Sequence, residues 1–166
     1  HANGPGYGFE EDGGPALFGN NILSNSAYIN GGGVFLEFSA ASIVGNFFQG
    51  NDAEDGGGIS VLMGNATIDR NDLSANTAHR GGGLHFQGGN AMVYNNIIAD
   101  NQVTESGSAL YTFGASPYLA HNTIVNNTGG DGSGIHVTDE YGAHAAVYLT
   151  NTVLVSQTVG IDAQSN

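Results

Sequence analysis

The stretch Gly31-Gly32-Gly33-Val34 returns along the chain as Gly56-Gly57-Gly58-Ile59 and again as Gly81-Gly82-Gly83-Leu84. The small residue that precedes each apolar restart advances by 25 or 26 residues at every step. The residues in this register are Gly8, Gly33, Gly58, Gly83, Ala109, Gly134 and Gly160. A constant period of this length is typical of stacked structural repeats, not of a single globular core.

A second motif, apolar-x-x-Asn-x-apolar-x-x-Asn, follows each glycine run, as in Ile43, Asn46, Phe48 and Asn51. We place its last, altered copy at Tyr148, Asn151, Val153 and Ser156. The two asparagine positions form the series Asn20, Asn46, Asn71, Asn96, Asn122 and the series Asn25, Asn51, Asn76, Asn101, Asn127. Because equivalent residues of stacked repeats lie above one another, these series predict two ladders of amides at bends, with asparagine in left-handed backbone.

Between these motifs, apolar residues alternate with polar or small ones, as in Ile59-Ser60-Val61 and Leu84-His85-Phe86. Alternation in short runs bounded by Gly and Asn predicts strands, and no stretch of ten residues has a helical period. We expect three short strands per turn, each beside its equivalent about 4.8 Å away in the next turn. Gly33, Gly58, Gly83 and Gly134 are expected at tight corners that a side chain would block.

The composition narrows the choice of partners. Lysine is absent, Arg70 and Arg80 are the only arginines, and 15 acidic residues give a net charge of −13. Such a chain cannot neutralise phosphates, which excludes nucleic acid and anionic membrane surfaces as partners. There is no cysteine for a disulfide or thiolate site, and no apolar run reaches the ~18 residues of a membrane span. We therefore expect no membrane insertion.

These repeats resemble the right-handed parallel β-helix repeat family, whose fold is that of the pectin-lyase-like superfamily. The similarity extends from Gly8 to about Asp162. Gly56-Gly57-Gly58-Ile59 and Phe48-Gln49-Gly50-Asn51 are similar to the repeats of bacterial outer-membrane passenger proteins, and Thr150–Ser156 resembles stretches of repetitive bacterial surface proteins. The resemblance implies an all-β, right-handed parallel β-helix of about six to seven turns of ~25 residues. We expect one domain over 1–166, with an irregular lead-in at 1–7.

One outward column of strand residues is expected after the glycine corners: Glu10, Phe35, Ser60, His85, Tyr111, His136 and Asp162. Phe35, His85, Tyr111 and His136 are its candidate ligand-binding face, for a glycan, and we expect them to be exposed strand residues. For a polysaccharide lyase or hydrolase of this fold, the candidate catalytic residues are Asp12, Glu37 and His85. The family's lyases use calcium-binding carboxylates and a basic residue, and neither arginine lies on this face.

Charged residues also precede the glycine corners. Counting back from the corners places Asp55 next to Arg80 and Glu54 next to His79 on adjacent turns. Asp52, Glu54 and Asp55 are the candidate calcium ligands, since carboxylate oxygens suit that ion. The alternative is that Arg80 neutralises the stacked acids. We expect no required cofactor, and calcium is the cation that these carboxylates suit.

The segment 138–146 is the longest departure from the period, and insertions in solenoids often map to binding surfaces. No capping helix is visible at either end, so each end exposes strand edges. We therefore predict a structural protein without enzymatic activity: an extracellular or cell-surface fibre subunit, stalk or adhesin that associates end to end with itself. The alternative is a polysaccharide-active enzyme or glycan-binding module.

Overall fold

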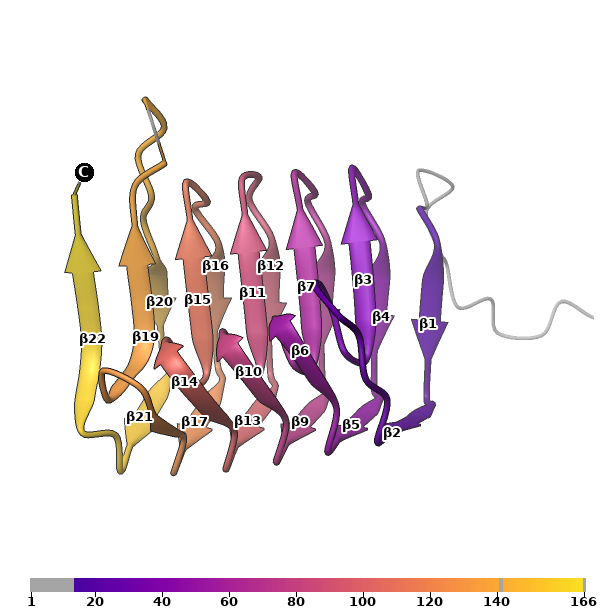
Figure 1. The fold of residues 1–166 in the computed structure, drawn as a ribbon. Coiled ribbons are helices and arrows are strands. Elements are labelled where there is room, and N and C mark those ends of the chain that lie inside the picture. Colours follow the sequence, from indigo (N-terminus) through magenta and orange to yellow (C-terminus); the bar gives the residue numbers. More distant parts are fainter. Residues whose placement is uncertain (1–13, 141, 166) are drawn as a thin grey trace, which may run out of the picture.

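The computed structural model describes residues 14–140 and 142–165, and it confirms a parallel β-helix of six turns. Three six-stranded parallel sheets run the length of the solenoid (Figure 1). Their strands lie side by side in the order of the turns. Each turn contributes one strand to every six-stranded sheet, so the sequence period is also the structural period.

The strands of the first sheet are β1 (Ala16–Phe18), β4 (Ser42–Val44), β8 (Thr67–Asp69), β12 (Met92–Tyr94), β16 (Tyr118–Ala120) and β20 (Tyr148–Thr150). The second contains β2 (Asn21–Leu23), β5 (Phe47–Gln49), β9 (Asp72–Ser74), β13 (Ile97–Ala99), β17 (Thr123–Val125) and β21 (Val153–Val155). The third contains β3 (Val34–Glu37), β7 (Ile59–Leu62), β11 (Leu84–Gln87), β15 (Leu110–Phe113), β19 (Ser133–Thr138) and β22 (Val159–Gln164).

A fourth, four-stranded sheet departs from the expected three strands per turn. It is made of β6 (Asp52–Asp55), β10 (Thr77–Arg80), β14 (Gln102–Ser106) and β18 (Thr128–Gly129). The sequence predicted charged turns here, but Ala53, Ala78 and Val103 are buried and alternate with outward polar residues. This alternation lets the segment pair as a strand. Asp55 and Arg80 are paired in register, as predicted.

The core consists of columns of apolar side chains inside the tube. One column runs through Ile43, Ile68, Val93 and Leu119, and another through Phe48, Leu73, Ile98 and Ile124, all at most 1% exposed. The third sheet adds its own inward residues, such as Ile59 and Leu84. Full burial of a branched or aromatic side chain stabilises the fold by about 1.5–3 kcal/mol, so these columns supply most of the driving force.

The two predicted asparagine ladders are present. Asn101 shows the pattern: its Oδ1 accepts hydrogen bonds from the backbone and side-chain nitrogens of Asn76, and its Nδ2 donates to Asn127 Oδ1 and to the Leu73 carbonyl. The left-handed backbone, however, lies one residue earlier than predicted. Ala75 and Asp100 have φ of 53° and 56° and precede the ladder residues Asn76 and Asn101.

The corner glycines act differently from one another. Gly56, two residues before the predicted corner residue, has a φ of 71°, which disfavours any side chain. Gly58 has no positive φ, but a Cβ there would lie 2.6 Å from the carbonyl oxygen of Gly83. Gly33 and Gly83 are confined by the next turn's backbone in the same way, whereas the atoms nearest to a Cβ on Gly134 belong to the side chain of Gln157.

In the last turn, the observed strand register differs from the predicted register by one residue. Leu149, and not Tyr148, pairs with Leu119, and Leu154, and not Val153, pairs with Ile124. A shift of one residue would turn every side chain of a strand to the other face, and this register turns the leucines inward. Thr152 and Gln157 therefore take the ladder positions, while Asn151 and Ser156 take the left-handed positions before them, with φ of 46° and 59°.

The insertion between β19 and β20 extends beyond the other turns of the solenoid (Figure 1). Thr138 still belongs to β19, so the departure begins one residue later than predicted. Glu140 and Ala143 form an antiparallel bridge, and the backbone nitrogen of Ala145 donates to Asp139 Oδ1. In the described residues there is no helix long and apolar enough to cross a membrane.

Candidate metal site

The outward column of the third sheet has the predicted register but not the predicted exposure. Ser60, His85, Tyr111 and His136 follow one another in adjacent strands, and Asp162 ends the column. His85, Tyr111 and His136 are only 3%, 7% and 6% exposed. The expectation of exposed rings was therefore wrong for these three, while Phe35 is 41% exposed.

The chain buries this column by folding back over it. A Cβ on Gly56 would lie 2.9 Å from the Ser60 Cβ, and one on Gly81 would lie 3.0 Å from the His85 Cβ. The Arg80 guanidinium also lies 5.6 Å from the centre of the Tyr111 ring. The four-stranded and third sheets thus meet in a narrow concave corner, and the rings do not present a flat face to a sugar.

Within this corner the rings stack along the solenoid. The ring centres of His85 and Tyr111 are 5.5 Å apart, and those of Tyr111 and His136 are 5.1 Å apart with planes inclined by 3°. Burial, followed by the charge of Arg80, lowers the pKa of His85 to about 3. Burial is also the main cause that raises the pKa of Tyr111. His85 is thus neutral near pH 7, with its Nδ1 3.1 Å from Ser60 Oγ.

The predicted calcium ligands do not converge on one point. Asp52 and Glu54 lie on the outer face of β6, whereas Asp55 alternates to the inner face and is buried. Arg80 occupies both oxygens of Asp55, with Nε and Nη2 at 2.8 and 2.9 Å. Asp52 Oδ1 accepts a hydrogen bond from Thr77 Oγ1 at 2.5 Å. The strand that formed in place of a turn separates the three carboxylates.

The candidate catalytic set does not assemble either. Asp12 and Glu10 lie outside the described residues. Glu37 is exposed on β3, whereas His85 is buried on β11, two strands away in the third sheet. A buried imidazole cannot reach a polymer, so the described part of this set offers no shared acid–base site.

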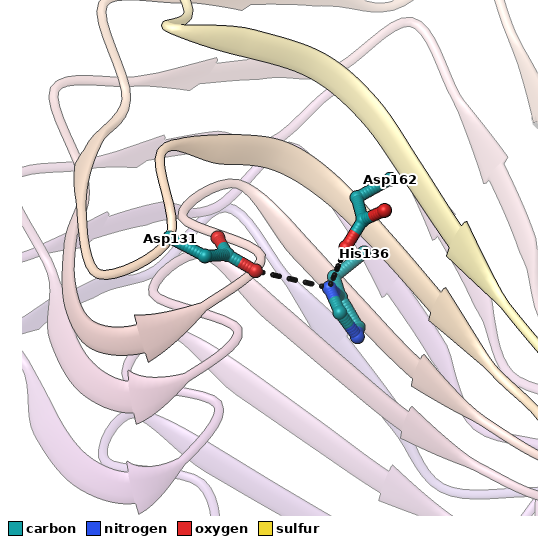
Figure 2. Close-up of side chains that lie close together, drawn as sticks. All are labelled: Asp131, His136 and Asp162. Atoms are coloured by element: carbon teal, nitrogen blue, oxygen red, sulfur yellow. Dashed lines mark ion pairs between the residues drawn. The ribbon is translucent and has the colours of Figure 1, made fainter.

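A different cluster forms where the column ends. His136 on β19 lies between Asp131, in the turn before that strand, and Asp162 on β22 (Figure 2). Its Nδ1 is 3.2 Å from Asp131 Oδ2 and 3.2 Å from Asp162 Oδ2. The candidate ligand atoms of the three residues all lie within 4.8 Å of one another. Two adjacent strands and one turn thus supply one imidazole and two carboxylates.

Hydrogen bonds from neighbouring residues orient the two carboxylates of this cluster. Asp131 Oδ1 accepts hydrogen bonds from Ser133 N at 2.8 Å and Ser133 Oγ at 2.6 Å, which leaves Oδ2 directed toward His136. Asp162 Oδ2 also accepts from Gln164 Nε2 at 2.7 Å. The buried His136 Nδ1 makes no hydrogen bond with acceptable geometry, in spite of its two close carboxylates.

The sequence contained part of this cluster. His136 and Asp162 are adjacent in the predicted outward column, and Asp131 precedes the corner at Gly134 in the sequence. Their convergence could not be inferred, because the fold of the turn at 130–132 is irregular. Gly130 and Gly132 have positive φ there, and the turn directs Asp131 into the concave corner.

A family model described as a right-handed β-helix region matches residues 4–166. No curated protein and no solved structure matches the chain significantly.

Proposed function

The chain belongs to the right-handed β-helix family, and on that premise we propose that it is a structural solenoid segment without enzymatic activity. It would serve at a cell surface or outside the cell as part of a fibre, stalk or adhesin. The fold alone does not imply a function, since β-helices carry many, so the proposal depends on this chain's own surfaces. Its specific form is end-to-end association with a second copy.

The observation that carries the proposal is the open last turn. Leu149 and Ile161 are 39% and 46% exposed, although their partners one turn earlier, Leu119 and Ile135, are fully buried. All of these residues belong to inward-facing columns. Among the described residues, the last turn therefore exposes apolar core positions and the unpaired edges of β20, β21 and β22.

A further β-helical turn would pair with these strand edges and cover the exposed apolar side chains. It would supply strands in parallel register and apolar side chains for the exposed columns. The first described turn of a second copy offers apolar residues at the equivalent column positions, since Leu17, Ile22 and Val34 pack against the core but are only partly buried. Head-to-tail contact of this kind is heterologous and does not close, so it produces filaments.

Light scattering over a concentration series tests this proposal, with two variants on one strand. Leu154→Glu places a charge in the open core, and Val155→Glu places the same charge on the outer face, where Val155 is 47% exposed. Burying an unpaired carboxylate is strongly unfavourable. We expect the wild type and Val155→Glu to associate and Leu154→Glu to stay monomeric. A wild-type chain that stays monomeric at high concentration would contradict the proposal.

A groove on the outer face of the four-stranded sheet favours glycan binding as a second candidate. It measures about 550 Å³ and is lined by Tyr28, Asp52, Glu54, Thr77 and His79, among others. Tyr28 is 93% exposed, so its ring is available to stack on an apolar sugar face. We expect Tyr28→Ala to abolish binding on a glycan array. Phe38→Ala, which removes another exposed ring, is the matched control.

A further inference from the structure

We propose that Asp131, His136 and Asp162 form a binding site for a divalent transition-metal ion of the Zn²⁺ type. The site joins the last two strands of the third sheet, β19 and β22, to the turn that precedes β19. It shares β22 with the end-to-end surface of the proposed function, but neither proposal requires the other.

The first argument is the buried imidazole nitrogen that makes no hydrogen bond. The His136 side chain is 8% exposed, and its Nδ1 is buried without a hydrogen bond. An imidazole nitrogen has one in-plane direction for a hydrogen or a lone pair, so it cannot serve two carboxylates at once. Figure 2 shows Nδ1 flanked by both carboxylates, while the other ring nitrogen points away from them. A cation between the three groups would satisfy all of them.

The second argument is the spacing. Ligand atoms at about 2.0–2.2 Å from a zinc-sized ion lie about 2.9–3.6 Å from one another in tetrahedral or octahedral arrangements. The two distances of 3.2 Å from Nδ1 to the carboxylate oxygens fall inside that interval. The separation of the two carboxylates is at most 4.8 Å, and rotation of these partly exposed aspartate side chains, 35% and 34% exposed, would close the set.

The third argument is the local charge. The chain contains no lysine and only two arginines. Arg70 contacts Asp69 at 3.0 Å, and Arg80 contacts Asp55 and Glu105 at 2.8 and 3.8 Å. Neither arginine is therefore engaged with Asp131 or Asp162. Two carboxylates held beside each other without an arginine or lysine favour a bound cation as counter-charge.

The donor set selects the class of ion. Calcium and magnesium prefer oxygen ligands, whereas imidazole with carboxylates suits zinc and its neighbours. The same reasoning disfavours calcium at Asp131, His136 and Asp162. With three protein ligands, one or more coordination positions would be left to water.

Calorimetric titration of the chelator-treated protein with ZnCl₂ tests the site. We expect one ion per chain for the wild type and a loss of affinity of about 100-fold or more for Asp162→Asn, because changes even outside the ligand set reduce metal affinity 10–100-fold. His144→Gln is the matched control, since it removes a histidine that lies 3.2 Å from Asp139 but outside the cluster. It should bind as the wild type does.

A second readout identifies the ligand atom. Zinc should shift the ¹⁵N resonance of His136 Nδ1 in the wild type, and not in Asp162→Asn at the same zinc concentration. Asp162 is at the solvent-accessible end of the column, so its amide variant should stay folded, which circular dichroism verifies. Absence of stoichiometric zinc binding, equal affinity in Asp162→Asn, or binding of calcium in preference to zinc would overturn the proposal.

Discussion

The inner turns and the last turn of this solenoid have the same strand order but different degrees of closure. In the inner turns, ladder residues such as Asn101 are fully buried and bonded on both sides. In the last turn, Gln157 donates to Val155 O in its own turn, and its Oε1 is buried without a hydrogen bond. The ladder side chains of an inner turn are thus hydrogen-bonded to the turns before and after it. In the last turn, hydrogen-bonding groups and apolar side chains are left that a further turn could contact.

The largest difference should appear when the two ladder positions are truncated. Asn101→Ala removes the acceptor of the Asn76 backbone nitrogen and of one of the two hydrogen bonds of Asn76 Nδ2, which keeps Phe48 O, and it removes one donor to the Leu73 carbonyl. Each buried group left unsatisfied costs about 1–3 kcal/mol. We expect it to lower the free energy of unfolding by about 3–5 kcal/mol, and Gln157→Ala to lower it by less than about 1 kcal/mol. Urea titrations measure both. Equal losses would remove the distinction between inner and last turns.

Adding a methyl group to equivalent corners is the next test. In Gly58→Ala the new Cβ would lie 2.6 Å from a backbone oxygen of the next turn, which must move. In Gly134→Ala it meets the Gln157 side chain at 2.7 Å, and that side chain can rotate away. We expect a loss of about 1–3 kcal/mol for Gly58→Ala, as for other overpacked sites, and little change for Gly134→Ala. Thermal unfolding of the two variants compares them.

Acid should destabilise the inner turns through His85. Its pKa is about 3 in the folded chain, below the ordinary value of 6.5, so the unfolded chain binds more protons between these values. Stability from this residue is complete above pH 6.5 and is lost as the pH falls toward 3. We expect it to account for about 2 kcal/mol between pH 7 and 5.

Comparison of variants isolates this contribution from the carboxylates. His85→Gln should reduce the slope of unfolding free energy against pH, measured by urea titration at each pH. His121→Gln, which changes an exposed histidine, should leave the slope as in the wild type. An unchanged slope in His85→Gln would show that the buried column does not control the acid response.

The smallest expected effect is an increase in the stability of the folded chain. Gln157→Asn places the shorter amide of the ladder in the last turn, where it can accept from the nitrogens of Asn127 as Asn127 accepts from those of Asn101. One or two added hydrogen bonds should stabilise the chain by about 1 kcal/mol. A small rise in the melting temperature is the observable. A fall would show that the last turn cannot extend the ladder.

Most of the architecture could be predicted from the period. The core columns, both ladders and the Asp55–Arg80 contact follow because equivalent residues of stacked turns must be neighbours. The register failed only after the insertion that follows β19, where counting from Leu119 no longer identifies Leu149 as its partner. An insertion of irregular length removes the reference that the period provides.

The candidate site was less predictable. Alternation correctly assigned His85, Tyr111 and His136 to the outer side of the third sheet, but it does not say what packs against that side. The concave corner arises from backbone at Gly56 and Gly81, and so the buried stack could not be inferred from the column alone. Asp131 reaches His136 through an irregular turn, which no repeat pattern specifies.

Hydrogen exchange of the chelator-treated wild type, compared at low and high protein concentration, tests the central claim most directly. We predict that amides of β20, β21 and β22 exchange faster than those of β9, β11 and β13 in dilute solution. They should become protected as the concentration rises, because a second copy covers the open turn. Exchange in the last turn that does not change with concentration would contradict the account.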